Sequence, residues 1–235
     1  SSTAASFFPG AWGGAKTQYI IRASELTAAG ITAGPITSLG FDVTVVGQTY
    51  QGFRVQLGHT TATAMTTTFL TDPLTQVYLG TLADDGYLPT VGVNTLAFGT
   101  GAGSSSSFTW DGTSNIVVNI CWSRVPSATT STSSTMKVDA TGFTCSVYEQ
   151  SDSLTPADMC AKTVGDGTGS NRPQFIFNAQ LVAPGAGTLA YTWNDPSSTT
   201  GNVVTVNPTS TTTYTVAGYD SATGCTGYKT TTVTV

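Results

Sequence analysis

The residues that could carry acid–base chemistry are few. The chain has one histidine, His59, and no G-x-S-x-G segment that would hold a nucleophilic serine on a strained turn. Two groups of acids, Asp84 with Asp85 and Glu149 with Asp152, could supply the paired carboxylates of a glycosidase, but both lie in turn-like sequence without flanking aromatic subsites. We therefore expect no enzymatic activity and interpret His59 as a structural residue at a strand end.

Asp111 and Asn115 are the weak candidates for a cation site. They bound a short segment, Asp111-Gly112-Thr113-Ser114-Asn115, whose side-chain oxygens are closely spaced. Calcium takes about six to eight oxygen ligands and favours several carboxylates, whereas this segment supplies one. A hairpin turn, with Asp111 capping the backbone and Gly112 at positive φ, accounts for the same residues. We favour the turn, and we expect no metal ion and no cofactor.

The four cysteines predict a disulfide rather than a metal centre. Cys121, Cys145, Cys160 and Cys225 include no C-x-x-C pair, and His59 has no cysteine neighbour, so zinc-ligand spacing is absent. A bond from Cys145 to Cys160 would close a loop of about 15 residues and stabilise the fold by about 3 kcal/mol. We predict this bond. Cys121, inside an apolar run, fits a buried thiol, with Cys121 to Cys225 as the remaining pairing.

Aromatic side chains are the residues that could bind sugars by stacking. Three of the four tryptophans lie at strand spacing and fit a β-sandwich core: Trp110, Trp122 and Trp193. The apolar N-terminal stretch with Phe7, Phe8 and Trp12 precedes the first strand and has no obvious place in a core. We predict that it is an assembly arm that inserts into a neighbouring molecule. A sugar platform and a tail packed on its own domain are the alternatives.

The composition limits the elements that can position these residues. Of 235 residues, 46 are Thr and 23 are Ser, only 9% are charged and 39% are hydrophobic. Thr and Ser are mediocre helix formers, and Thr, Val, Tyr and Phe favour strands. The net charge of −5 supplies no basic stripe for nucleic acid, and no apolar run reaches the length of a membrane span. The composition predicts an all-β protein that is not a cytosolic helical enzyme.

Alternating polar and apolar residues predict many short strands, for example at residues 53–57, 77–79, 213–216 and 232–235. Gly and Pro clusters separate them, as in a jelly-roll-like antiparallel β-sandwich. The one convincing helix signal lies between Ser24, as the cap, and Gly30, as the end. Composition shifts after the strand at residues 175–177. We place an N-terminal arm at residues 1–14, the sandwich at 15–180, and a second, Thr-rich domain at 181–235.

Two parts of the chain resemble known modules. The strings ITAGPITSLGFDV (31–43) and FTWDGTSNIVV (108–118), with residues 19–26 and 53–61, resemble a β-sandwich module of large proteins exported by the type IX secretion route of gliding Gram-negative bacteria. YTW (191–193), VNPTSTTTYTV (206–216) and residues 224–235 resemble the Ig-like or PKD-like repeats of the same proteins. The resemblance implies a small Ig-like β-sandwich at residues 181–235. Such repeats usually open with a cysteine-bearing strand that is missing here, so this domain is expected to be incomplete.

The resemblance implies an extracellular or cell-surface protein, but these modules accompany adhesins, filaments and enzymes alike. An open sheet edge favours strand pairing with another chain. We expect a structural or adhesive subunit of a surface fibre or adhesin that self-associates through β-strands. A carbohydrate-binding accessory module, with a glycan or another surface ligand, is the alternative. Ser153 and Ser221 lie in Asp-Ser-apolar tripeptides that resemble the O-glycosylation signal of the same bacteria.

Overall fold

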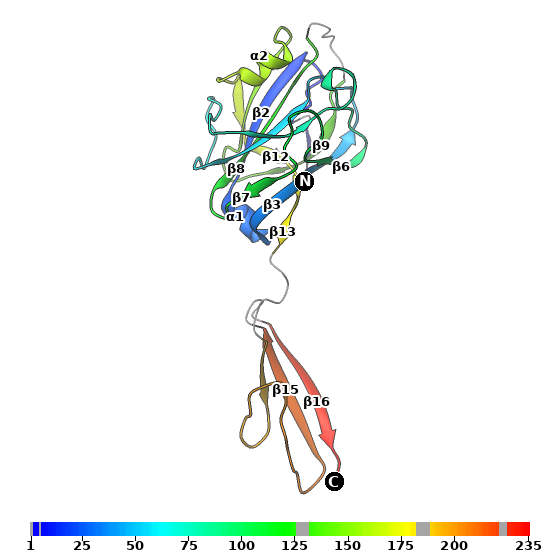
Figure 1. The fold of residues 1–235 in the computed structure, drawn as a ribbon, viewed down its shortest axis with the longest axis vertical. Helices are drawn as coiled ribbons and strands as arrows, with labels where there is room; N and C mark the ends of the chain where they lie inside the picture. The colour runs from blue at the N-terminus through cyan, green and yellow to red at the C-terminus, as the bar shows by residue number, and fades with distance from the viewer. Residues whose placement is uncertain (1, 5, 126–131, 182–188, 221–224) are drawn as a thin grey trace. The chain divides into compact units, whose positions relative to one another are not determined.

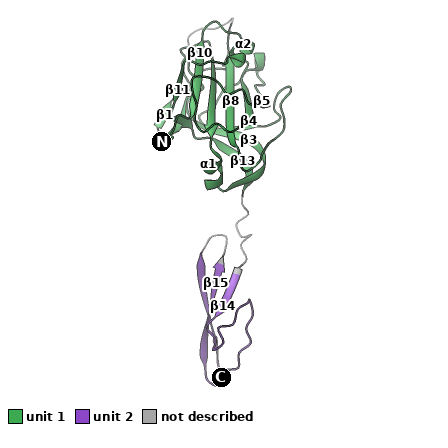
Figure 2. Ribbon diagram, turned by 90° about the vertical axis from the view of Figure 1, so that its left-hand side faces the viewer, with its two compact units in different colours: residues 1–181 green, residues 182–235 purple. Residues whose placement is uncertain are grey.

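A computed structural model describes residues 2–4, 6–125, 132–181, 189–220 and 225–235 of the chain. The chain divides into two compact units, unit 1 at Ser1–Leu181 and unit 2 at Val182–Val235 (Figure 2). All pairings between the named strands are antiparallel. The protein is therefore all-β, as its composition predicts.

Unit 1 is a β-sandwich of two antiparallel sheets (Figure 1). The seven-stranded sheet has the order β1 (Ser2–Ala4), β9 (Thr135–Ala140), β3 (Ile31–Val45) and β13 (Ile176–Leu181), with β12 (Asn171–Pro173) also paired to β9, and β6 (Gly92–Ala97) and β7 (Phe108–Trp110) paired to β3. The six-stranded sheet has the order β11 (Gly167–Gly169), β10 (Ser146–Ser151), β2 (Gly14–Ile21), β8 (Asn115–Ser123), β4 (Arg54–Thr60) and β5 (Thr75–Leu79).

The main core lies between the sheets and includes Trp110 and Trp122, both fully buried as predicted. Strand β8 is apolar without alternation because both of its faces are covered. Its inner residues, among them Ile116 and Ile120, join the main core. On the outer face, Val117 packs in a second cluster with Phe69. The long apolar run in the sequence is thus a central strand with two buried faces.

Two short α-helices and one 3₁₀ turn interrupt the strands of unit 1: α1 (Ala23–Ala28), α2 (Pro156–Ala161) and η1 (Ala83–Asp85). Helix α1 fulfils the helix prediction, but its N-cap is Arg22 rather than Ser24. The Glu25 carboxylate accepts a hydrogen bond from the Arg22 backbone N–H at 2.8 Å, which satisfies an N-terminal donor. Gly30 follows the helix with φ of +78°, where glycine costs no strain.

The N-terminal arm belongs to the core of its own domain. Phe7 and Phe8 have no exposed surface, and the Phe8 ring stacks on Tyr50 with centroids 4.0 Å apart. The indole N–H of Trp122 donates to the Phe7 carbonyl at 2.6 Å. Phe7 and Phe8 thus have a place in the core of this chain, so the expectation that this stretch has none is wrong. Residues that lie between two sheets can fill the core without belonging to either sheet. No hydrophobic periodicity in the sequence indicates such residues. Trp12 is 40% exposed.

The predicted disulfide is also wrong, because Cys160 bonds to Cys121 rather than to Cys145. Strand register explains the pairing. Cys121 and Glu149 both lie opposite Lys16, so the three share one cross-strand row. Cys145 lies four residues before Glu149, about 13 Å away along the strand direction. Cys145 is a buried free thiol.

Helix α2 sits over that same row and is held there by two kinds of bond. The disulfide joins Cys160 to Cys121 of β8, with the Cα atoms 5.4 Å apart. The Lys16 ammonium donates to the carbonyls of Cys160 and Lys162 at 2.8 and 2.6 Å, which satisfies acceptors at the helix C-terminus. Burial lowers the pKa of Lys16 to about 8. Glu149 forms an ion pair with Lys162 at 2.8 Å.

The described part of unit 2 forms one antiparallel sheet, in the order β14 (Leu189–Trp193), β15 (Thr212–Asp220) and β16 (Thr226–Val233). No second sheet faces it among these residues, so the two layers of a complete Ig-like sandwich are not both present. Trp193 is half-buried, and its indole N–H donates to the Gly201 carbonyl at 2.9 Å. Among the described residues of this unit, Tyr214 of the central strand is the large hydrophobic side chain that is buried.

Candidate functional site

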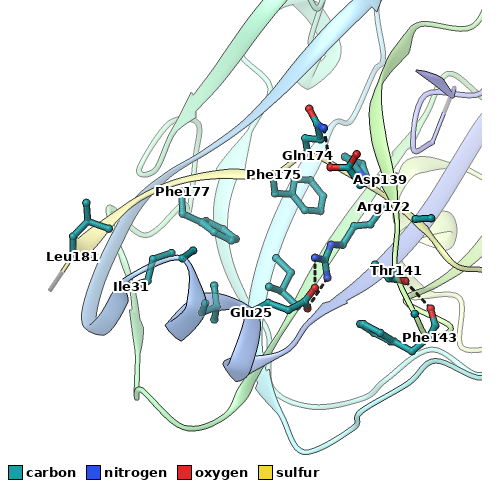
Figure 3. Close-up of a pocket in the computed structure, with 16 residues that line it drawn as sticks. Glu25, Ile31, Asp139, Thr141, Phe143, Arg172, Gln174, Phe175, Phe177 and Leu181 are labelled. Atoms are coloured by element: carbon teal, nitrogen blue, oxygen red, sulfur yellow. Dashed lines mark hydrogen bonds and ion pairs between the residues drawn. The ribbon is translucent and has the colours of Figure 1, made fainter. Parts of the chain in front are cut away.

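A cavity of about 720 Å³ opens in unit 1 where helix α1, strand β12 and strand β13 meet (Figure 3). Helix α1 contributes Glu25, β12 contributes Arg172, and the loop after β9 contributes Phe143. Phe175 lies just before β13, and Phe177 lies on it. The volume of the cavity is within the range of small-molecule sites, about 300–1,000 Å³.

An ion pair between α1 and β12 forms the centre of this pocket. The Arg172 guanidinium donates from Nη2 to Glu25 Oε1 at 2.7 Å and from Nη1 to Glu25 Oε2 at 3.0 Å. Nη1 also donates to the Ile20 carbonyl at 2.6 Å. A bidentate contact of this kind fixes the plane of both groups. The pocket centre is therefore a preorganised polar surface.

The charge state of Glu25 follows from these contacts. Partial burial alone would raise the pKa of its carboxyl, but the hydrogen bonds from Arg172 and Arg22 outweigh it and lower the pKa below the ordinary value. Glu25 is thus ionised at neutral pH and balances Arg172. Asp139, which accepts a hydrogen bond from the Gln174 amide at 2.7 Å, adds a second carboxylate to the rim. The charged groups lining the pocket are one cation and two anions.

Aromatic rings line the pocket on both sides of the ion pair, Phe175 and Phe177 from the β13 side and Phe143 from the loop (Figure 3). The Phe175 ring packs against the Tyr19 ring with centroids 5.4 Å apart, which holds it from the core side. The Arg22 guanidinium covers the Phe143 ring at 3.5 Å from its centroid. Contacts with other side chains of the protein therefore hold the Phe175 and Phe143 rings in place.

The sequence offers little that points to this pocket. Glu25 and Arg172 are separated by 147 positions, and neither lies in a motif. The alternation of Phe175 and Phe177 indicates a strand face, but it does not indicate that the face is half-buried and lines a cavity. Only the pairing of β13 with β3 and of β12 with β9 brings the parts together.

The open edge of unit 2 is the second candidate site. Strand β16 pairs with β15 along eight positions, Tyr219 to Thr212, and its other edge has no strand partner within residues 189–220 and 225–235. Seven of its eight residues are exposed, and Tyr228 is 74% exposed. Lys229 is its one charged residue. Long edge strands with few charges and no proline favour pairing with another chain.

Asp111 and Asn115, the weak metal candidates, belong to the predicted turn. Asp111 Oδ1 accepts hydrogen bonds from the backbone N–H groups of Thr113 and Ser114, at 2.8 and 2.7 Å, and Gly112 has φ of +83°. The hydrogen bonds from Ser114 and Thr113 hold the pKa of Asp111 well below its usual range. Asn115 points elsewhere and binds the backbone of Ala23 and Ala62. The described residues contain no cluster of three or more His, Cys, Asp or Glu side chains that could hold a metal ion.

The residues weighed for catalysis lie apart and serve local structure. His59 is half-buried, and its ring packs against Phe108 with centroids 4.8 Å apart. Asp84 and Asp85 are exposed on η1. Asp152 accepts a hydrogen bond from the Gly13 backbone N–H at 2.7 Å. None of these four residues lines the pocket.

Of the two predicted glycosylation sites, one falls on described residues. Ser153 is exposed in the segment between β10 and α2, where its backbone N–H donates to the Ser151 hydroxyl at 3.2 Å. Ser221 lies outside the described residues. An exposed hydroxyl fits a modification site but does not by itself identify one, so glycosylation of both residues stays a prediction.

Comparisons of the chain with protein-family models, with curated proteins and with solved structures give no match. Neither α-helix among the described residues has the length and apolar composition needed to span a bilayer. The disulfide between Cys121 and Cys160 is compatible with an extracellular location, where such bonds persist.

Proposed function

We propose that this chain is an extracellular structural or adhesive protein, a subunit of a surface fibre or adhesin, and that it assembles by β-strand pairing through strand β16. The observation that carries the proposal is the uncovered edge of β16 in the single-layered sheet of unit 2. A sheet of this size gains stability from further strands or a covering layer. A second chain that adds a strand supplies both backbone hydrogen bonds and side-chain contacts.

The two edges of this sheet differ, which selects β16 as the pairing edge. The outer edge of β14 is already occupied, because Trp193 N–H donates to the Thr199 carbonyl and Gly201 N–H donates to the Tyr191 carbonyl, both at 2.9 Å. No comparable contact covers the outer edge of β16 among the described residues. A partner strand therefore meets unsatisfied backbone groups on β16 and satisfied ones on β14.

The side chains of β16 suit a self-pairing edge. One face of β16 carries the uncharged residues Thr226, Tyr228, Thr230 and Thr232, and Thr232 exchanges a hydrogen bond with Thr213 of β15 at 2.9 Å. Thr–Thr and aromatic–Thr pairs across strands are favourable. A second copy of β16, placed antiparallel, would extend the same pattern across a two-fold axis and close as a dimer, which would be the unit of the fibre or adhesin.

The remaining features support an exported, non-catalytic role. The chain is rich in hydroxyl side chains and has only 9% charged residues, and a disulfide anchors helix α2 to the sandwich. The carboxylates of Glu149 and Asp152 are each used in structural bonds. Export by the type IX route remains part of the proposal, supported by the resemblance of the two sequence blocks.

The test is the oligomeric state of the intact chain as a function of concentration, measured by light scattering after size exclusion and by negative-stain microscopy. The edge variant Tyr228→Lys/Thr230→Lys adds two charges on β16, since lysines are a natural protection of sheet edges. The matched control is Asn202→Lys/Thr209→Lys, with the same charges on exposed positions between β14 and β15.

We expect the wild-type chain to form dimers or larger assemblies, the edge variant to stay monomeric, and the control to associate like wild type. A wild-type chain that stays monomeric up to its solubility limit would overturn the proposal. So would an edge variant that assembles as well as the control, because association would then use another surface.

A further inference from the structure

We infer that the pocket between α1, β12 and β13 is a binding site for an uncharged sugar, one or more pyranose units of a neutral glycan. The pocket lies in unit 1 and is independent of the strand β16 through which assembly is proposed. A pyranose has an apolar C–H face and a rim of hydroxyls. The pocket offers an aromatic wall that matches the C–H face and hydrogen-bonding groups that match the hydroxyls.

The aromatic wall comes from Phe177 and Phe175. Both rings are half-buried, so each has one part packed on the core and one part facing the cavity. Ile31 and Leu181 lie with Phe177 at one end of the pocket (Figure 3). Leu181 is 61% exposed, which places an apolar group at the pocket rim. This end offers the C–H face of a sugar a surface that water solvates poorly.

The polar groups lie beside that wall rather than among its rings. A guanidinium has five N–H groups, and the Arg172 contacts to Glu25 and Ile20 use three of them. Gln174 donates its amide N–H to Asp139, and its Oε1 makes no hydrogen bond among the described residues. The pocket thus holds both donors and an acceptor in fixed positions, as paired sugar hydroxyls require.

Charge selects a neutral ligand over an acidic one. Glu25 neutralises Arg172 directly, so the guanidinium keeps hydrogen-bonding capacity without net attraction for an anion. A uronic acid, a sulfated sugar or a phosphate would therefore gain no net attraction from Arg172 and would lie beside the Glu25 carboxylate, which is unfavourable.

Fixed walls reduce the cost of binding. The Glu25–Arg172 pair, the packing of Phe175 on Tyr19 and the cation–π contact on Phe143 hold these lining side chains through the protein's own contacts. Few side chains therefore need to be ordered when a sugar enters, and that ordering is a main cost of binding. The exposed Trp12, the sugar platform that the sequence alone suggests, does not line the pocket.

The experiment uses the intact chain on an array of neutral oligosaccharides built from glucose, mannose, galactose and N-acetylglucosamine, together with uronate and sulfated glycans. Hits are quantified by calorimetry, and short apolar peptides are titrated in parallel. Three variants follow: Phe177→Ala removes a wall, Gln174→Ala removes a polar group, and Trp12→Ala is the control outside the pocket. Near-ultraviolet circular dichroism checks that each variant keeps the wild-type fold, and Gln174→Ala serves if Phe177→Ala does not.

We expect a neutral glycan to bind, Phe177→Ala to weaken it by about tenfold or more, Gln174→Ala to weaken it by about threefold or more, and Trp12→Ala to leave it unchanged. The inference is overturned if no neutral glycan binds, if acidic glycans or apolar peptides bind better, or if Trp12→Ala abolishes binding. The lysine variant of β16 must bind the glycan like wild type, so that failure of one proposal is distinguishable from failure of the other.

Discussion

Breaking the disulfide between Cys121 and Cys160 is expected to cost unit 1 a large share of its stability. The two cysteines are 39 positions apart, and closing a loop of that length in the unfolded chain corresponds to about 4 kcal/mol at 25 °C. For a domain of this size, 1 kcal/mol corresponds to about 2–4 °C in melting temperature. We therefore expect Cys160→Ser to melt about 8–16 °C below the oxidised wild type.

The control for this experiment is Cys145→Ala, which removes a buried thiol that forms no disulfide. Loss of a single buried sulfur leaves a small cavity and costs about 1 kcal/mol. Urea unfolding followed by circular dichroism measures both variants, and peptide mapping without reductant identifies the bonded pair. The reasoning is refuted if the map joins Cys145 to Cys160, or if Cys160→Ser unfolds within about 1 kcal/mol of wild type.

Four further predictions follow from single contacts. Phe8→Ala, at a site without exposed surface, should cost about 3–5 kcal/mol in urea unfolding, and Trp12→Ala should cost much less; similar small losses for both would contradict the place of the arm in its own core. The folded pKa of Glu25 lies below its usual value, so its contribution to stability is complete above about pH 4.3 and is lost as the pH falls through the lower folded pKa. Glu25→Gln should therefore flatten the acid limb of stability against pH, and an unchanged limb would exclude the role of the ion pair. Asp111→Ala should lower the melting temperature slightly through lost turn hydrogen bonds, while calcium should not shift the wild-type melting temperature; a calcium-dependent rise would restore the metal site. Mass spectrometry of native protein should find a glycan on Ser153, and only unmodified peptide would remove that prediction.

The sequence predicts those helices and strands whose pattern lies within a few neighbouring residues. The apolar run at Ile116–Trp122 marks a strand buried on both faces, and the helix before Gly30 forms as expected. Helix α2 was missed although its signal is present, since Thr155 precedes Pro156 and caps the helix by accepting a hydrogen bond from Asp158 N–H. A six-residue helix in a Thr-rich chain offers too few turns for an apolar period to stand out.

Features that depend on strand register were not predictable in the same way. Loop length alone favours Cys145 as the partner of Cys160, because the shorter loop looks easier to close. The strand register determines the actual pairing, because Lys16 of β2 lies opposite Cys121 on the neighbouring strand β8 and opposite Glu149 on the neighbouring strand β10. A single sequence contains no record of which residues lie opposite one another on neighbouring strands. For the same reason the sequence does not indicate the pocket, because its two central residues, Glu25 and Arg172, lie near opposite ends of the sequence of unit 1.

The N-terminal arm and the pocket are connected by the same aromatic packing. The Phe7 ring lies 6.5 Å from the Phe175 ring, and Phe175 is also a wall of the pocket. An arm donated to a neighbouring molecule would remove Phe7 from behind Phe175 and leave that wall unsupported. Assembly through the arm would thus disturb the proposed glycan site, whereas assembly through β16 leaves unit 1 intact. A protein that binds a glycan and assembles at the same time would need assembly through β16. This favours the open edge of unit 2 as the assembly surface.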